Sequence, residues 1–206
     1  MKTKLTLLFI AIASFFVQAQ NTEACTETLS LMSTSVKAKD VTAYDYLTTL
    51  RKDCPSFHKS IYSLGEFAVK LKIEKATTPQ DKEKYVRDLL KLYDEHDQYF
   101  PNNGAGNKMK KGLALFENKI GTSDEVFQLL DVAFKTDYAN CKYAKAMYVY
   151  FEILVNNHKA NKGVELQQVF DKYDDISKKL DEEEKELSEE NDGFLTREEA
   201  GQVLSD

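Results

Sequence analysis

The chain of 206 residues is predicted to be all-α, with about four antiparallel helix pairs between Glu23 and Leu180. Eight segments carry apolar residues at the three- and four-residue spacing of one helix face. Proline, glycine or Thr/Ser/Asp clusters separate them, as at helix ends. No segment alternates β-branched and polar residues as a half-buried strand does. We expect a helical domain over residues 20–180, followed by an acidic helical tail, residues 181–206, which could begin a further element.

The first nineteen residues have the pattern of a cleaved secretory signal. Lys2 and Lys4 precede the apolar run LTLLFIAIASFFV, which ends at a small-residue site, Val17-Gln18-Ala19. No later segment approaches the roughly 18 apolar residues that a transmembrane helix needs. We therefore expect export to the periplasm or the cell exterior and no transmembrane segment after signal cleavage. An uncleaved N-terminal anchor is the alternative.

The first two helix pairs are divided by Pro55. A rather polar helix over Glu23–Val36 comes first, and Asp40 is expected to cap the next. After Pro55 a helix runs to about Lys75. Thr77-Thr78-Pro79 stops this helix, and either Thr78 or Asp81 is placed to start its partner.

The last two pairs are marked by clear turns. The third pair breaks at Gly121 and resumes at Thr122-Ser123-Asp124, a helix-start pattern. The fourth pair is the most periodic, with helices over Tyr143–Val155 and Leu166–Leu180 around the turn Asn156–Gly163.

The stretch Asp40–Ala68 carries small and bulky residues in a regular order around a proline. The residues at the relevant spacing are Ala43, Leu47, Leu50, Pro55, Ile61, Leu64, Gly65 and Ala68. This order resembles the junction between two tetratricopeptide repeats, although Leu50 is large where the repeat usually has alanine. Pro55 and Pro101 are 46 residues apart rather than about 34, so any repeat is lengthened and degenerate. The alternative is an ordinary helical bundle with a chance proline.

Resemblance to exported bacterial tetratricopeptide-repeat proteins implies an α-solenoid with degenerate repeats that binds a protein or peptide and is not an enzyme. It implies that Gly65 is small so that the second helix of its own pair can approach closely. It also places a set of side chains in the binding groove, namely Lys59, Tyr62, Glu66, Val69 and Lys70. The alternative is that these residues form a plain exposed face. Such proteins often carry further repeats, so the chain could be a fragment.

Three cysteines follow the signal. Cys25 should open the first helix and Cys54 should close its antiparallel partner, which brings the two side by side. Because an exported chain is in oxidising surroundings, we favour a disulfide between Cys25 and Cys54, with Cys141 as the unpaired cysteine. The alternative is that all three are small buried apolar residues.

Charge is concentrated at the C-terminal end. The formal charge of −6 becomes −8 when Lys2 and Lys4 leave with the signal. Residues 181–206 hold eleven acidic residues against Lys185 and Arg197, so residues 20–180 stand close to neutral. No basic stripe is present to hold a phosphate backbone, and nucleic-acid binding is not expected.

The sequence leaves two alternative functions open. Residues 188–199 are laid out like a calcium loop, with Asp192 and Glu199 at ligand positions, but Ser188 opens it where a carboxylate belongs. A calcium-responsive module is therefore an alternative, against an acidic helix broken at this point. The three histidines lie far apart and have no partner at ligand spacing, so we expect no enzyme, metal or cofactor. The remaining alternative is an enzyme whose site only the fold assembles.

Overall fold

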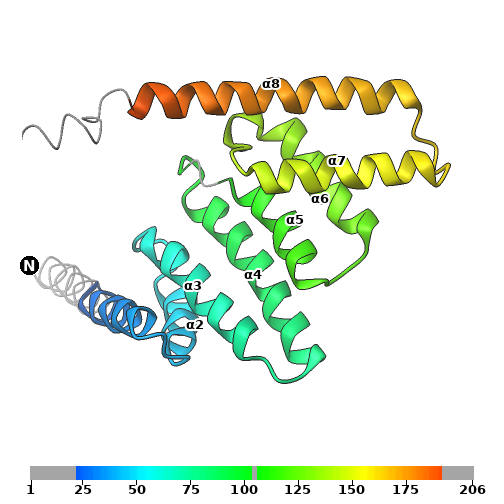
Figure 1. Ribbon diagram of the computed structural model, residues 1–206. Coiled ribbons are helices and arrows are strands. Elements are labelled where there is room, and N and C mark those ends of the chain that lie inside the picture. The colour runs from blue at the N-terminus through cyan, green and yellow to red at the C-terminus, as the bar shows by residue number, and fades with distance from the viewer. Residues whose placement is uncertain (1–21, 104–105, 192–206) are drawn as a thin grey trace, which may run out of the picture. The chain divides into compact units, whose positions relative to one another are not determined.

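The computed structural model describes residues 22–103 and 106–191 (Figure 1). Within these ranges the regular elements are eight α-helices and one short 3-10 turn, with no strand, so the all-α prediction is confirmed for this part of the chain. No helix in the described ranges is long and apolar enough to cross a bilayer. The expected signal, residues 1–19, and the candidate calcium ligands Asp192 and Glu199 lie outside the described residues.

The chain divides into two compact units, with the division between Asn107 and Lys108. We call them the N-terminal and the C-terminal unit. The range 20–180 that the sequence suggests as one domain includes parts of both. The expected start of a separate tail at residue 181 falls inside a continuous helix.

The N-terminal unit contains a first helix over residues 22–37, then α2 (Ala43–Asp53), α3 (Ser60–Lys75) and α4 (Pro79–Tyr99). Helix α3 packs against both α2 and α4. The fully buried residues that form this core include Met32, Ala43, Leu47, Leu50, Ile61, Val69, Val86, Leu89 and Leu92. They recur at helical spacing on each helix, which is why these segments form helices and why they pack on one another.

Short-range hydrogen bonds set the helix starts. Thr78 caps α4, because its hydroxyl oxygen accepts the Asp81 N–H at 3.1 Å and Pro79 follows at a position where no N–H is needed. Asp40, expected from the sequence to cap α2, instead lies two residues before the N-cap residue Thr42 and accepts its N–H at 2.9 Å, and α2 has no side-chain cap. Lys39 takes a left-handed φ of 54° and ends the first helix.

The C-terminal unit contains most of α5 (Asn107–Asn118), then α6 (Ser123–Thr136), the 3-10 turn η1 (Tyr138–Asn140), α7 (Ala144–Lys159) and α8 (Leu166–Asn191). Thr122 caps α6 by accepting the Glu125 N–H at 3.1 Å. Helix α7 packs against both α6 and α8. The core of the C-terminal unit includes Leu115, Leu130, Ala133, Ala146, Met147, Val149 and Tyr150.

Helix α8 passes the expected boundary at residue 180 because charged residues hold its C-terminal half. Lys179 is buried and pairs with Glu183 at 2.6 Å, and its ammonium lies 4.9 Å from the Tyr138 ring centroid. Lys142, just after η1, pairs with Glu186 at 2.8 Å. In this part of α8 the sequence no longer places apolar residues at regular helical spacing. The charged contacts there take the place of apolar packing.

Candidate functional site

Three of the five residues proposed for the groove lie at the surface of the N-terminal unit. Lys59 is exposed just before α3. Lys70 is exposed and donates to Glu66 at 2.6 Å, one turn earlier on the same helix. This i,i+4 pair holds both side chains on one face of α3 and neutralises part of the Lys70 charge.

Tyr62 and Val69 differ from this expectation and are buried. Tyr62 is 2% exposed, and its ring stacks on His96 of α4 with centroids 5.2 Å apart and planes 4° from parallel. Its hydroxyl donates to the Pro55 carbonyl at 3.0 Å. Burial raises the pKa of this hydroxyl above its ordinary value. Tyr62 therefore belongs to the core, because α4 covers the face of α3 on which it lies.

The structure instead forms a groove of about 310 Å³ further along α3. It lies between α3 and the C-terminal end of the first helix. Its lining residues are Val36, Lys39, Phe67, Ala68, Lys70, Leu71, Glu74 and Lys75. We call this set the α3 groove. Of the predicted residues, only Lys70 takes part in it.

Phe67 is the notable member of the α3 groove, since its side chain is 63% exposed. In the sequence it is one of several apolar residues on α3, and nothing in their spacing separates it from the core residues. The one sign in the sequence that an apolar residue of α3 would be exposed is their number, because α3 carries more apolar residues than two packed faces can bury. Contiguous exposed apolar surface marks interaction sites, and Phe67 contributes to such surface together with Val36 and Leu71 of the same groove.

The rim of the α3 groove is cationic. Lys39, Lys70 and Lys75 stand against two acids: Glu66 pairs with Lys70 at 2.6 Å, and Glu74 lies 3.8 Å from Lys75, the distance of a loose pair. The surface therefore combines apolar walls with surplus positive charge. It suits an apolar side chain flanked by carboxylates.

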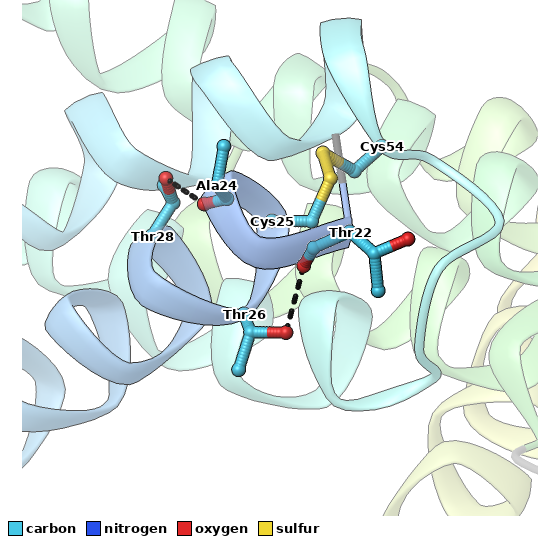
Figure 2. The surroundings of a disulfide bond; sticks show 6 residues. All are labelled: Thr22, Ala24, Cys25, Thr26, Thr28 and Cys54. Atoms are coloured by element: carbon cyan, nitrogen blue, oxygen red, sulfur yellow. Dashed lines mark hydrogen bonds between the residues drawn. A yellow bond between two sulfur atoms is a disulfide. The ribbon is translucent and has the colours of Figure 1, made fainter. Parts of the chain in front are cut away.

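A disulfide joins Cys25 of the first helix to Cys54 (Figure 2). Cys25 lies in the first turn of the first helix and Cys54 directly follows α2, with their Cα atoms 6.1 Å apart. The exposed side of that turn is polar, and Thr26 and Thr28 donate their hydroxyls to carbonyls four residues earlier, both at 2.8 Å. The bond ties the first helix to α2, so the helix that carries Val36 is held covalently.

Cys141 is free and buried in the C-terminal unit. Burial, with a smaller contribution from Asp137, raises the pKa of its thiol to about 11. Its Sγ donates to the Asp137 carbonyl at 3.4 Å. A thiol in this state has little nucleophilic character at neutral pH.

A charged network joins α2 to α4. The Arg51 guanidinium donates to both oxygens of Glu95, at 2.6 and 3.0 Å, and to Asp88 at 2.9 Å. The Tyr44 hydroxyl also donates to Asp88, at 2.9 Å. Hydrogen bonds to the two carboxylates hold the pKa of Arg51 above its ordinary value although burial opposes this. Each charge has a partner from the fold, which identifies the network as structural.

A second cluster lies between α6, α7 and α8, beside a cavity of about 390 Å³. Asp131 accepts from the Tyr150 hydroxyl at 2.6 Å and from Lys135 at 2.8 Å. Burial by itself would raise the pKa of Asp131, but these two hydrogen bonds outweigh it and lower the pKa. The Lys172 ammonium lies 4.7 Å from the Phe134 ring centroid and pairs with Asp175 at 3.0 Å. These charged and polar groups therefore also find their hydrogen-bond and ion-pair partners within the fold.

The histidines serve local structure. His58 accepts the Ser60 N–H at 3.1 Å at the start of α3, and His158 lies 2.7 Å from the Val164 carbonyl across the α7–α8 turn. His96 is buried in the N-terminal core. Over residues 22–103 and 106–191, no group of three or more His, Cys, Asp or Glu side chains is placed to hold a metal ion.

The α3 groove is thus the site in which geometry and charge together favour a ligand. Comparison of the chain with protein-family models, with curated proteins and with solved structures finds no match in any of the three.

Proposed function

We propose that this chain is an exported, non-enzymatic scaffold that binds a protein or peptide in the α3 groove. The observation that carries the proposal is Phe67, a phenylalanine 63% exposed on the wall of a groove with a lysine-rich rim. Leaving such a ring in water is unfavourable, and covering it with an apolar side chain recovers that free energy.

Two features support the wider context. The Cys25–Cys54 bond is of a kind that persists in oxidising compartments, which agrees with export behind a secretory signal. Helix α3 contacts both α2 and α4, and Gly65 lies close to Leu47 of α2 and Leu92 of α4, which supports a repeat-like stack in the N-terminal unit. On this basis we propose a degenerate tetratricopeptide-like arrangement for that unit.

The groove suggests the chemistry of its ligand. An apolar or aromatic side chain of the ligand would pack on Phe67 and Leu71, while neighbouring carboxylates would contact Lys39 and Lys75, the latter being only loosely paired with Glu74. Because the disulfide already fixes the first helix, binding would need little ordering of that wall. The expected ligand is therefore a short acidic segment with an apolar anchor.

The test is selection of a displayed library of random peptides on the mature chain. Affinities of the enriched peptides are then measured by fluorescence polarisation for wild type, Phe67→Ser and Phe170→Ser. Phe170 is a matched control, since it is 56% exposed but lies on α8 in the other unit. We expect peptides with an apolar anchor and flanking acids, at least tenfold weaker binding to Phe67→Ser, and unchanged binding to Phe170→Ser. Peptides that bind Phe67→Ser as tightly as wild type would contradict the proposal.

A further inference from the structure

Helix α8 carries an apolar stripe that no described part of the C-terminal unit covers. Leu166, Phe170 and Tyr173 are each more than half exposed, and Leu180 is 39% exposed. Their spacings of four, three and seven residues place them along one side of the helix. The buried side of α8, which bears Val169 and Ile176, lies next to this stripe, and Tyr173 at its edge also contacts α7.

Helix α7, which lies beside α8 (Figure 1), extends this stripe. The Phe151 ring lies 5.9 Å from the Tyr173 ring, centroid to centroid. Tyr148, one turn before Phe151, is 64% exposed. We call these six residues, four from α8 and two from α7, the α7–α8 face. Contiguous exposed aromatic and leucine side chains of this kind mark an interaction surface.

The stripe on α8 is symmetric about Tyr173. Leu166 and Leu180 lie seven residues, two helical turns, on either side of it. If a second α8 lay antiparallel on the first, Leu166 of each copy would meet Leu180 of the other, and the two Tyr173 rings would meet at the axis. This is the self-complementarity that a two-fold interface requires.

The charges at the two ends of the stripe favour the antiparallel direction. Near Leu166 lie the exposed lysines Lys159 and Lys162, of which Lys162 also pairs with Asp124 at 3.3 Å, and beyond Leu180 lie the exposed acids Asp181 and Glu184. Antiparallel packing brings the acidic end of one copy to the lysines of the other. Parallel packing would bring two acidic ends together, which is repulsive.

We propose that the α7–α8 face is the interface of a homodimer, in which a second copy of this chain packs antiparallel along α8 about a two-fold axis at Tyr173. The dimer leaves the α3 groove out of the interface and does not depend on the function proposed for that groove.

Sedimentation equilibrium of the mature chain measures the association. We expect twice the chain mass for wild type and the single chain mass for Tyr173→Lys at the same concentration. Val132→Lys is the matched control, because it places a lysine at a 52% exposed apolar residue of α6 that belongs neither to the α7–α8 face nor to the α3 groove, and it should remain dimeric. Circular dichroism of each variant checks that the helices are intact. Wild type that stays monomeric at every concentration would overturn the proposal, and the face would then be assigned to another protein or to residues 192–206.

Cysteine cross-linking tests the direction of packing. Under oxidation by copper–phenanthroline and dissolved oxygen, Tyr173→Cys should form a disulfide-linked dimer. Leu166→Cys alone should stay unlinked, whereas a mixture of Leu166→Cys and Leu180→Cys should link. Cys141 is buried and serves as the internal unreactive thiol. Self-linking of Leu166→Cys, or an unlinked Tyr173→Cys, would overturn the antiparallel dimer.

Discussion

Gly65 lies so close to Leu47 that a Cβ atom at Gly65 would stand 2.7 Å from Leu47 Cδ1. The same atom would stand 3.3 Å from Leu92 Cδ2, so α3 approaches both α2 and α4 at this residue. The sequence placed the close approach on the second helix of the same pair, α4. The structure makes the contact with α2 the tighter one.

The effect of a substitution at Gly65 on the free energy of unfolding should depend on the size of the new side chain. Gly65→Ala gains about 1 kcal/mol of helix propensity, which the displacement of one terminal methyl of buried Leu47 offsets, so its free energy of unfolding should stay within about 1 kcal/mol of wild type. Gly65→Leu overpacks the contact and should cost about 1–3 kcal/mol or more. Urea unfolding of the three proteins measures both.

Gly112 provides the comparison. A Cβ atom there would stand 2.6 Å from both Cγ and Cδ2 of Leu130, so the whole buried side chain must move rather than one methyl. Gly112→Ala should therefore lose about 1–3 kcal/mol of unfolding free energy, more than Gly65→Ala.

If Gly65→Leu proves as stable as wild type, the close packing of α2, α3 and α4 is wrong, and the repeat-like proposal loses its main support.

Removal of the disulfide should destabilise the N-terminal unit. The bond joins residues 29 apart, and closing a loop of this length stabilises by about 3–4 kcal/mol in the chain-entropy treatment. Cys25→Ser/Cys54→Ser should lose about that much free energy of unfolding in urea. Thiol titration of unfolded, unreduced wild type should find one reactive group, Cys141. Three reactive thiols in the wild type would rule the bond out.

Arg51 should matter more than its half-buried position suggests. Arg51→Ala leaves Asp88 and Glu95 facing each other without their shared cation, which should cost about 2–3 kcal/mol. Lys91→Ala is the control, because Lys91 is exposed and pairs loosely with Glu95 at 3.7 Å, and it should cost under about 0.5 kcal/mol. Thermal and urea unfolding measure both losses, and equal losses would contradict the structural role of the network.

The Asp131 cluster should make stability depend on pH in the acid range. The pKa of Asp131 is lowered in the folded chain from its ordinary 3.8, so its contribution is present above pH 3.8 and is lost as the pH falls through the folded pKa. Asp131→Asn should be less stable than wild type at neutral pH, and the difference should narrow below pH 3.8. Tyr150→Phe removes one of the two donors and should show a smaller pH-dependent difference. Urea midpoints across this pH range test the prediction, and a constant difference would refute it.

The sequence by itself determined where the helices lie. Apolar residues at helical spacing mark each helix, and the caps Thr78 and Thr122 bond to N–H groups only three residues away. Such interactions are local, so their signal is complete within a short stretch. The all-α class and the positions of the turns follow from it.

Only the tertiary structure decided which of these side chains are exposed to solvent. Tyr62 and Phe67 are aromatic residues on one helix, yet His96 covers Tyr62 and leaves Phe67 at a groove. The pairing of Arg51 with Glu95 spans 44 residues, and α8 continues past residue 180 because Lys142 and Lys179 hold its acids. Burial and ion pairing depend on neighbours that are distant in the chain. The periodicity of a single segment does not contain that information, since it records which residues share a helix face but not what packs against that face.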